Sequence, residues 1–429
     1  MLNKFSQVKA HPKYEKVMHW GKLISITGSA QIIVQAVGFL TGILVIRLLP
    51  TQEYALYTLA NTMLGTMTVL SDGGISTGVM AQGGKVWQDR EKLGVVLATG
   101  LDLRKKFAIG SLIVSTPILM YLLLHNGASW IIAVMIVLSI IPAFYAALSD
   151  SLLEVIPKLH QSILPLQKNQ VTVGIARLFL SAITLFIFPW TFVAIFASGI
   201  PRIYGNLKLR EITDELIDKE QKPDPVIQKE ILKMVYKILP GAIFFCISGQ
   251  ITIWLISVLG KTSSVAEIGA LSRIALLVHI FSFFFPILIV PRFARLQTHA
   301  KALFSQFIII ILLSGMFSLF MILMTKCFSS YILWFLGNNY KDLDSALLLV
   351  VIGSCIGMMS GLSFALSSAR GWVINPYFYM VGSLISIVIG ANLLNVSSLI
   401  GALSFNIFIS SIQFLIYFIY TLYRLIKLT

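Results

Sequence analysis

Arg177 is the residue of this sequence best placed to do unusual chemistry, because a long apolar segment surrounds it. It follows Lys168 by nine residues, so a helix that starts near this lysine carries the arginine about 13 Å into the segment. A charged side chain at such a depth in a membrane costs at least about 2.5 to 3.5 kcal/mol, and Arg177 should therefore face a bundle interior and have a partner. Its planar, permanently charged fork binds phosphate oxygens in pairs. Arg177 is either part of a binding site or a structurally paired side chain.

Two further arginines lie close to the ends of apolar segments. Arg47 is followed by Glu53, and Arg273 is preceded by Glu267. Both arginines are candidates to line the mouth of a cavity. The alternative is that they only anchor helix ends, as interfacial arginines often do.

Uncharged polar residues form a second group of candidates. Gln31 and Gln35 are four residues apart, so they share one face of a helix, and Asn61 and Gln250 lie at a comparable depth in their own segments. In a hydrated cavity such groups could bind the hydroxyls of a ligand. They could equally form hydrogen bonds between helices, as polar residues in membranes commonly do.

The sequence contains no catalytic constellation. There is no phosphate-binding loop, no HExxH and no paired cysteine motif. Cys246, Cys327 and Cys355 lie in or beside apolar segments without metal or redox spacing, and we interpret them as packing residues. We therefore expect no enzymatic activity, no metal site and no cofactor.

The elements that position these side chains must be transmembrane helices. The chain has 429 residues, of which 57% are hydrophobic and only 12% are charged, and its mean hydropathy is +0.86. A helix crosses the hydrocarbon core with about 20 apolar residues, so the length is enough for on the order of a dozen spans. These properties predict an all-α polytopic membrane protein.

We predict twelve spans in two sets of six. The first set covers residues 22–46, 53–76, 107–124, 129–149, 170–188 and 190–206. The second set covers residues 236–258, 267–290, 302–325, 344–368, 376–395 and 398–422.

Basic residues predict the orientation of these spans. The chain has 33 lysines and arginines, and with both termini in the cytoplasm all but six lie on the inner side. The exceptions are Arg177 within a span and, on the outer side, Arg47, Lys261, Arg273, Lys326 and Lys341. This asymmetry favours cytoplasmic termini. The formal charge of +15 is spread between apolar segments, which indicates topology signals and no nucleic-acid partner.

The longest polar stretch lies midway along the chain and divides it. Residues 208–233 carry charges of both signs and contain Pro223 and Pro225. We interpret the stretch as a cytoplasmic linker between an N-terminal lobe, residues 1–207, and a C-terminal lobe, residues 234–429. A solvated loop without a hinge role explains the same residues.

One part of the sequence resembles a known family. The segments GSAQIIVQAVGFLTGILVIRLLPTQEYALYTL, VLSDGGISTGV and DREKLGVVLATGLDLRKK resemble the first part of polysaccharide biosynthesis proteins. These are the O-antigen and capsule oligosaccharide flippases of the multidrug/oligosaccharidyl-lipid/polysaccharide (MOP) exporter superfamily. The specific part is Arg47 with Pro50, Glu53 and Tyr54, and the sequence departs from the family at Ala55, where glycine is usual.

The resemblance implies a MATE-like fold of two six-helix lobes around a cavity that opens alternately to each side of the bacterial inner membrane. It implies transport of a polyprenyl-diphosphate-linked oligosaccharide for O-antigen, capsule or exopolysaccharide synthesis, with membrane lipids and other polysaccharide-assembly proteins as partners. A cationic, hydrated path would help the diphosphate across. We therefore expect Arg177, Arg47, Arg273, Gln31, Gln35 and Asn61 to bind the substrate.

Three other functions compete with this one. A multidrug cation antiporter of the same superfamily would need a carboxylate deep in the membrane, whereas the acidic residues here cluster near the predicted interfaces. A membrane-embedded glycan polymerase or ligase usually carries a sizeable outer loop or a carboxylate motif, and the predicted outer loops are short. An assembly scaffold without transport is the third alternative.

Overall fold

The computed structural model describes residues 12–282, 289–294, 300–372 and 374–427, and every regular element in these ranges is helical. Twelve of the described helices have 18 residues or more, and each overlaps one predicted span. They are α2 (Pro12–Leu48), α3 (Thr51–Asp72), α5 (Arg90–His125), α6 (Trp130–Leu153), α8 (Ile163–Ile187), α9 (Thr191–Asp214), α10 (Pro225–Leu259), α11 (Thr262–Ser282), α13 (Ala300–Cys327), α15 (Asp344–Ala369), α16 (Pro376–Leu393) and α17 (Leu399–Ile426). Shorter helices connect some of them: α4 (Ile75–Val86), α7 (Val155–Leu159), α12 (Val290–Ala294), α14 (Ser329–Leu336) and the 3-10 turn η2 (Asn338–Tyr340).

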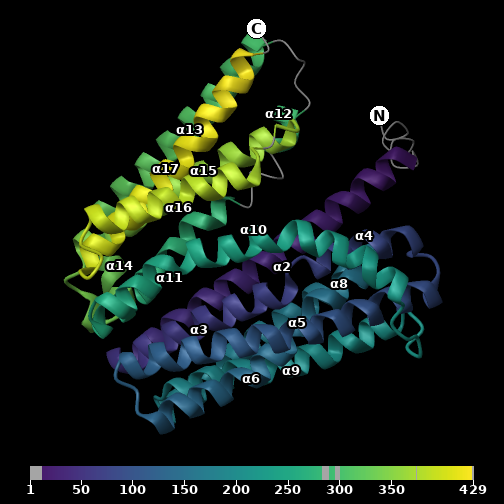
Figure 1. Ribbon diagram of the computed structural model, residues 1–429, viewed down its shortest axis with the longest axis horizontal. Helices are drawn as coiled ribbons and strands as arrows, with labels where there is room; N and C mark the ends of the chain where they lie inside the picture. The colour runs from purple at the N-terminus through teal and green to yellow at the C-terminus, as the bar shows by residue number, and fades with distance from the viewer. Residues whose placement is uncertain (1–11, 283–288, 295–299, 373, 428–429) are drawn as a thin grey trace, which may run out of the picture. The chain divides into compact units, whose positions relative to one another are not determined.

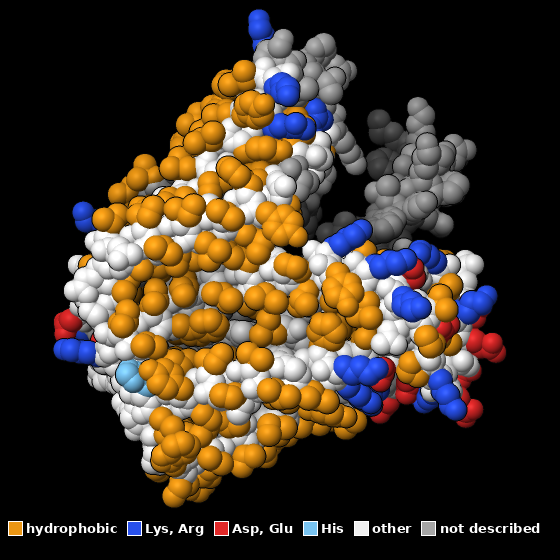
Figure 2. All heavy atoms as spheres, viewed as in Figure 1, with side chains coloured by type: hydrophobic (Ala, Val, Ile, Leu, Met, Phe, Trp, Pro, Cys, Tyr) orange, Lys and Arg blue, Asp and Glu red, His pale blue; other side chains and the backbone are white. Residues whose placement is uncertain are grey.

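Nine of the described helical segments are long and apolar enough to cross a membrane. The three long helices outside this group are α3, α9 and α11, which carry more polar residues. Apolar side chains cover much of the visible surface, whereas many lysine, arginine and acidic side chains gather near α4 (Figure 2). This is the surface of a multi-pass membrane protein, because lipid replaces water around the middle of each span.

Contacts divide the chain into two compact units. Unit 1 comprises residues 1–45, 63–120 and 131–243, and unit 2 comprises residues 46–62, 121–130 and 244–429. Five long helices, α2, α3, α5, α6 and α10, contribute residues to both units, and α6 contributes only Trp130 to unit 2. The division into lobes at residues 207 and 234 remains a prediction.

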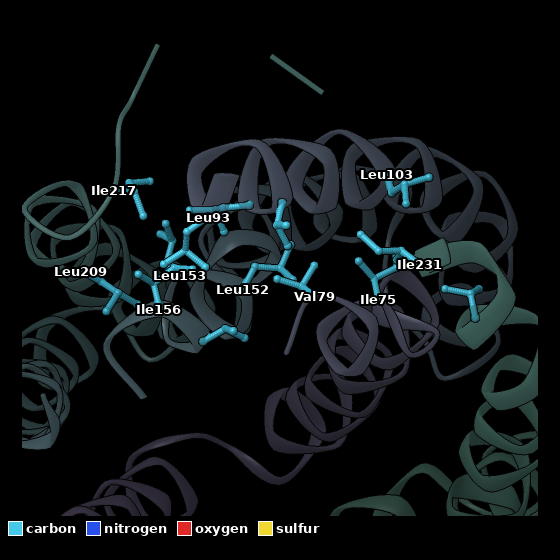
Figure 3. Packing of buried hydrophobic residues seen from close by; sticks show 14 of the residues in the cluster. Ile75, Val79, Leu93, Leu103, Leu152, Leu153, Ile156, Leu209, Ile217 and Ile231 are labelled. Carbon is cyan, nitrogen blue, oxygen red and sulfur yellow. The ribbon is translucent and has the colours of Figure 1, made fainter. Parts of the chain in front are cut away.

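Unit 1 has an apolar core near α4, where charged side chains gather on the surface. Ile75, Val79, Leu93, Leu152 and Ile231 are fully buried there, on helices that are far apart in the sequence (Figure 3). Gly73 and Gly74 both adopt positive φ, which only glycine does without strain, and they separate α3 from α4. The core therefore fixes this end of the helices against one another.

The polar stretch between α9 and α10 packs against the start of α5. Arg90 donates from Nη2 to the carbonyl of Glu215 at 2.7 Å, and the backbone N–H of Asp218 donates to the carbonyl of Arg90 at 3.1 Å. Hydrogen bonds from the Gln221 side chain and the backbone N–H of Glu220 hold the pKa of the Asp218 carboxyl below its usual value. The helices on either side shorten the predicted linker, since α9 extends to Asp214 and α10 begins at Pro225.

Unit 2 is built on pairs of neighbouring helices. α15 packs against α11, α13 and α17, and α16 packs against α17 (Figure 1). Leu303, Phe307, Leu362, Leu366 and Leu425 form a buried core between α13, α15 and α17. Serines 363, 383 and 386, all less than 2% exposed, allow the neighbouring helices to approach closely.

Candidate functional site

Unit 2 contains a polar cavity of about 300 Å³, which we call the Arg273 cavity. Three helices build it: the first half of α3, the second half of α10 and the middle of α11. Its lining residues are Tyr54, Thr58, Asn61, Thr62, Gln250, Ile253, Gly269, Ser272, Arg273 and Leu276. Most of these side chains are uncharged and can form hydrogen bonds.

A close contact between α3 and α11 shapes this cavity. A Cβ atom at Gly269 would lie 2.3 Å from Oγ1 of Thr58, so only glycine fits. The Thr58 hydroxyl donates at 2.9 Å to the backbone carbonyl of Tyr54, one turn earlier in α3. Arg273 lies one turn after Gly269, and the helix crossing therefore brings its guanidinium to the Tyr54 side of α3.

Aromatic hydroxyls position the guanidinium of Arg273. The rings of Tyr54 and Tyr57 stack with centroids 5.9 Å apart, and both hydroxyls lie within hydrogen-bonding reach of Arg273. Tyr54 is 1% exposed, so it is a fixed part of the wall. Of the residues known to line this cavity, Arg273 alone carries a charge, which makes the site cationic. Such a cavity can bind an anionic group together with hydroxyl or amide groups.

Unit 1 contains a second polar cavity of about 260 Å³, the Arg177 cavity. Side chains of α2, α6, α8 and α9 line it, together with one residue between α6 and α7. Its lining residues are Val34, Gly38, Thr41, Asp150, Glu154, Asn169, Gln170, Val173, Gly174, Arg177, Arg202, Gly205 and Leu209.

A glycine contact also shapes the Arg177 cavity. A Cβ atom at Gly205 would lie 2.3 Å from Cγ2 of Val173, and the side-chain amide of Asn169 donates to the Gly205 carbonyl at 2.9 Å. α8 and α9 are thus locked together at this level. Arg177 follows Val173 by one turn, and Arg202 precedes Gly205 by three residues, so both arginines face the same space.

Carboxylates balance the arginines in this second cavity. Nε of Arg202 donates to Asp150 at 3.0 Å, and the side-chain amide of Asn206 donates to the other oxygen of Asp150 at 2.6 Å. Glu154 accepts from Lys158 at 2.6 Å and from Gln170 at 3.1 Å. Two arginines and two carboxylates line the cavity, whose charges therefore compensate one another.

The structure brings some of the predicted residues together. Asn61 and Arg273 line one cavity along with Gln250, and Arg177 lines the other. Gln31 and Gln35 are half-buried on α2 and belong to neither set of lining residues. Gln31 lies one turn before Val34, on the face of α2 that reaches the Arg177 cavity. The substrate-binding roles of all these residues remain predictions.

Arg47 lies apart from both sets of lining residues and contacts the end of α14. Its Nε donates to the Phe335 carbonyl at 2.9 Å, and its Nη2 donates to the Trp334 carbonyl at 2.7 Å. Its guanidinium also lies 5.3 Å from the centre of the Trp334 ring. These contacts satisfy carbonyls in the last turn of a helix, where a cation is favourable.

Sequence reasoning overlooked the acidic side of the Arg177 cavity. Asp150 and Glu154 are four residues apart, and this spacing could have placed them on one face. A second ion pair of unit 1 joins Asp72 to Arg104, which is 2% exposed and also donates to Ser151 at 2.7 Å. Asp72 accepts from the backbone N–H groups of Gly74 and Ser76, both at 3.3 Å, and so caps the start of α4.

The described residues contain no group of three or more histidines, cysteines and carboxylates that could hold a metal ion. The side chains that line the two cavities offer hydrogen bonding and ion pairing.

Comparison with known proteins finds similarity in structure alone, since no protein-family model and no curated protein sequence matches this chain. An inward-facing multidrug resistance MATE family transporter of the MOP superfamily superimposes with a TM-score of 0.73 at 14% identity, covering 92% of this chain and 95% of that one. An outward-facing MATE family transporter gives 0.62 at 14% identity and covers 95% and 94% of the two chains.

A third structure is a MOP superfamily transporter from Pyrococcus furiosus, in which the reversed polarity of the binding pocket suggests a different function. It superimposes with a TM-score of 0.64 at 15% identity, covering 95% of this chain and 96% of that one. These likenesses extend over nearly the whole chain. The fold is therefore the all-α MATE-like fold of MOP superfamily transporters.

Proposed function

We propose that this chain is a transporter that moves a polyprenyl-diphosphate-linked oligosaccharide across the bacterial inner membrane for the synthesis of O-antigen, capsule or exopolysaccharide. The observation that carries the proposal is the Arg273 cavity, in which one arginine lies among uncharged hydrogen-bonding side chains. The resemblance of the first part of the sequence to oligosaccharide flippases also supports it.

The chemistry of the cavity suits the charged part of such a substrate. A guanidinium forms paired, charge-assisted hydrogen bonds with phosphate oxygens, and amide and hydroxyl groups such as Asn61, Gln250 and Thr62 can bind sugar hydroxyls. A volume of about 300 Å³ is at the lower end of the range for ligand pockets. It would hold the diphosphate with the nearest part of a sugar, while the prenyl chain stays in lipid.

A second candidate function is export of organic cations in exchange for protons or other cations. The observation that favours it is the pair of carboxylates, Asp150 and Glu154, in the Arg177 cavity. Both already accept hydrogen bonds from basic or amide side chains, and Arg177 and Arg202 share the space. A cationic substrate would have to displace these partners, and we therefore prefer the anionic substrate.

Reconstitution in vesicles separates the two functions. The wild-type protein should move a fluorescent lipid-linked oligosaccharide between leaflets and should not accumulate a cationic dye along an imposed proton gradient. Arg273→Ala should abolish most flipping. Arg292→Ala is the matched control, because Arg292 is an exposed arginine of the same unit outside the cavity lining. Dye uptake that requires Asp150, without oligosaccharide flipping, would replace the first proposal by the second.

We propose that both termini lie in the cytoplasm, on the basis of the asymmetry of basic residues. Reporter fusions at Asn126 and Asn395 should then be located outside and a fusion at Lys219 inside. A reproducible reversal at one of these positions would contradict the twelve-span topology. Polysaccharide-assembly proteins are the proposed partners, and co-purification from membranes under mild detergent conditions would test their association.

A further inference from the structure

The segment between α13 and α15 contains a short helix, α14, whose exposed side chains are aromatic except for that of Ser330. Tyr331 is 74% exposed, Trp334 is 60% exposed and Phe335 is 37% exposed. Leu333 and Leu336, on the other face, are fully buried. The spacing of three and four residues places the aromatic rings on one side of the helix.

The position of α14 between two spans indicates the environment of its aromatic face. α13 and α15 are both long and apolar enough to span a membrane, and they end and begin at Cys327 and Asp344. The chain between them must start and finish at the same boundary of the membrane. α14 has eight residues, which at 1.5 Å per residue extend only about 12 Å and cannot cross the hydrocarbon core.

The residues that flank and compose α14 are those of a membrane interface. Tyrosine and tryptophan prefer the level of the lipid headgroups, because their rings are apolar and their N–H or O–H groups are polar. Exposed lysines, Lys326 and Lys341, lie on either side of the helix in the sequence. Lysines at such positions interact with lipid phosphates.

Contacts from the α2–α3 turn hold α14 in place. Arg47 binds the carbonyls of Trp334 and Phe335, and Gly337, with φ 119°, ends the helix directly afterwards. The side-chain amide of Asn339 lies 3.3 Å from the hydroxyl of Thr51, the first residue of α3. Tyr340 is 2% exposed, so the end of this segment is anchored in the protein. The aromatic face is therefore presented by a fixed helix.

We infer that α14 is an interfacial helix whose Tyr331, Trp334 and Phe335 insert into the headgroup and upper acyl region of the phospholipid leaflet, and that Arg47 is the residue that holds it there. The partner of this surface is the phospholipid itself. The inference is independent of the transported substrate, since none of these residues lines either cavity.

Spin labels on the reconstituted protein test the inference. Cys327, the exposed cysteine next to α14, is first changed to serine, while the buried Cys246 and Cys355 are retained. A label at Tyr331→Cys in vesicles of phosphatidylethanolamine and phosphatidylglycerol should be relaxed more by oxygen, which dissolves in lipid, than by a water-soluble nickel chelate. The label at Lys219→Cys should show the opposite preference.

Two results at Tyr331 would overturn the lipid contact. Relaxation by nickel as strong as at Lys219 would place the aromatic face in water. Protection from both reagents would mean that protein covers it, and a second copy of the chain would then be the occupant.

The role of Arg47 is tested on the same label. Arg47→Ala should increase the mobility of the Tyr331 label and shift it towards water, whereas Arg292→Ala, which removes an exposed cation outside α14 and its flanking residues, should leave its mobility unchanged. Arg47→Lys should give an intermediate mobility, because an ammonium group can bind one carbonyl but lacks the planar fork. An unchanged spectrum in a correctly inserted Arg47→Ala protein would refute the anchoring role.

Discussion

The Arg273 cavity and the Arg177 cavity are built by the same packing device but differ in charge. In each, a glycine lies against a side chain of a neighbouring helix, and an arginine lies one turn from the contact. The Arg177 cavity also has two carboxylates and a second arginine, whereas Arg273 has tyrosine hydroxyls and uncharged neighbours. An arginine within a membrane segment therefore does not by itself define an anion site, because the charges around it decide whether an anionic ligand can compete for it.

The largest expected effect is the loss of transport when Arg273 is removed. Two charge-assisted hydrogen bonds to a phosphate contribute about 1.5 kcal/mol each, so Arg273→Ala should lower the flipping rate about 100-fold. Arg273→Lys should retain part of the activity, because the charge remains but the paired geometry is lost. Flipping is measured in vesicles at matched protein content, with thermal stability in detergent as the control. A stable Arg273→Ala protein with normal flipping would remove this cavity from the substrate path.

In the Arg177 cavity, removal of a charge should affect stability more than transport. Arg202→Gln removes the charge-assisted hydrogen bond from Arg202 to the half-buried Asp150 and should destabilise the protein by about 1.5 to 3 kcal/mol. The double variant Arg202→Gln/Asp150→Asn should recover most of this loss. Unfolding in detergent is followed by intrinsic fluorescence. If the single variant is as stable as the wild type, the ion pair makes no net contribution and the two cavities do not differ in this respect.

The glycines test whether both cavities depend on close helix packing. Gly269→Ala and Gly205→Ala each place a Cβ atom 2.3 Å from a neighbouring side chain, and overpacking of this kind costs about 1 to 3 kcal/mol. Gly249→Ala in unit 2 and Gly110→Ala in unit 1 are matched controls, because nothing lies within 4 Å of the added methyl group. Thermal unfolding should separate the two pairs. Equal stabilities would show that the helices can shift apart without loss.

The smallest effects concern access of water to the polar residues. Asn61 is exposed and lines the Arg273 cavity, so a cysteine there should react with a water-soluble thiol reagent. Cysteines at Gln31 and Gln35, which are half-buried outside both linings, should react more slowly. Labelling is compared in membranes and in denaturant. Complete protection of Asn61→Cys in every conformational state would indicate interhelical packing instead of a hydrated cavity.

The sequence by itself predicted where the long helices of the described residues lie. Runs of about 20 apolar residues are a local signal, and every predicted span overlaps a long helix of the structure, including the less apolar α3, α9 and α11. It also identified Arg177 and Asn61 as polar groups within such runs and Arg273 as a charged group near the end of one.

Only the tertiary structure decided the surroundings of these residues. The residues that line the cavity with Arg177 come in part from α2, α6 and α9, and Val34 lies 143 residues before Arg177 in the sequence. The spacing along one helix does not encode this arrangement. The rotation of each helix, set by contacts such as Gly205 on Val173, brings Asp150 to the same space. No carboxylate lies among the residues that line the cavity with Arg273, and Arg47 binds carbonyls of α14. These neighbours follow from how the helices pack, because the period of a single helix does not determine which side chains meet across helices.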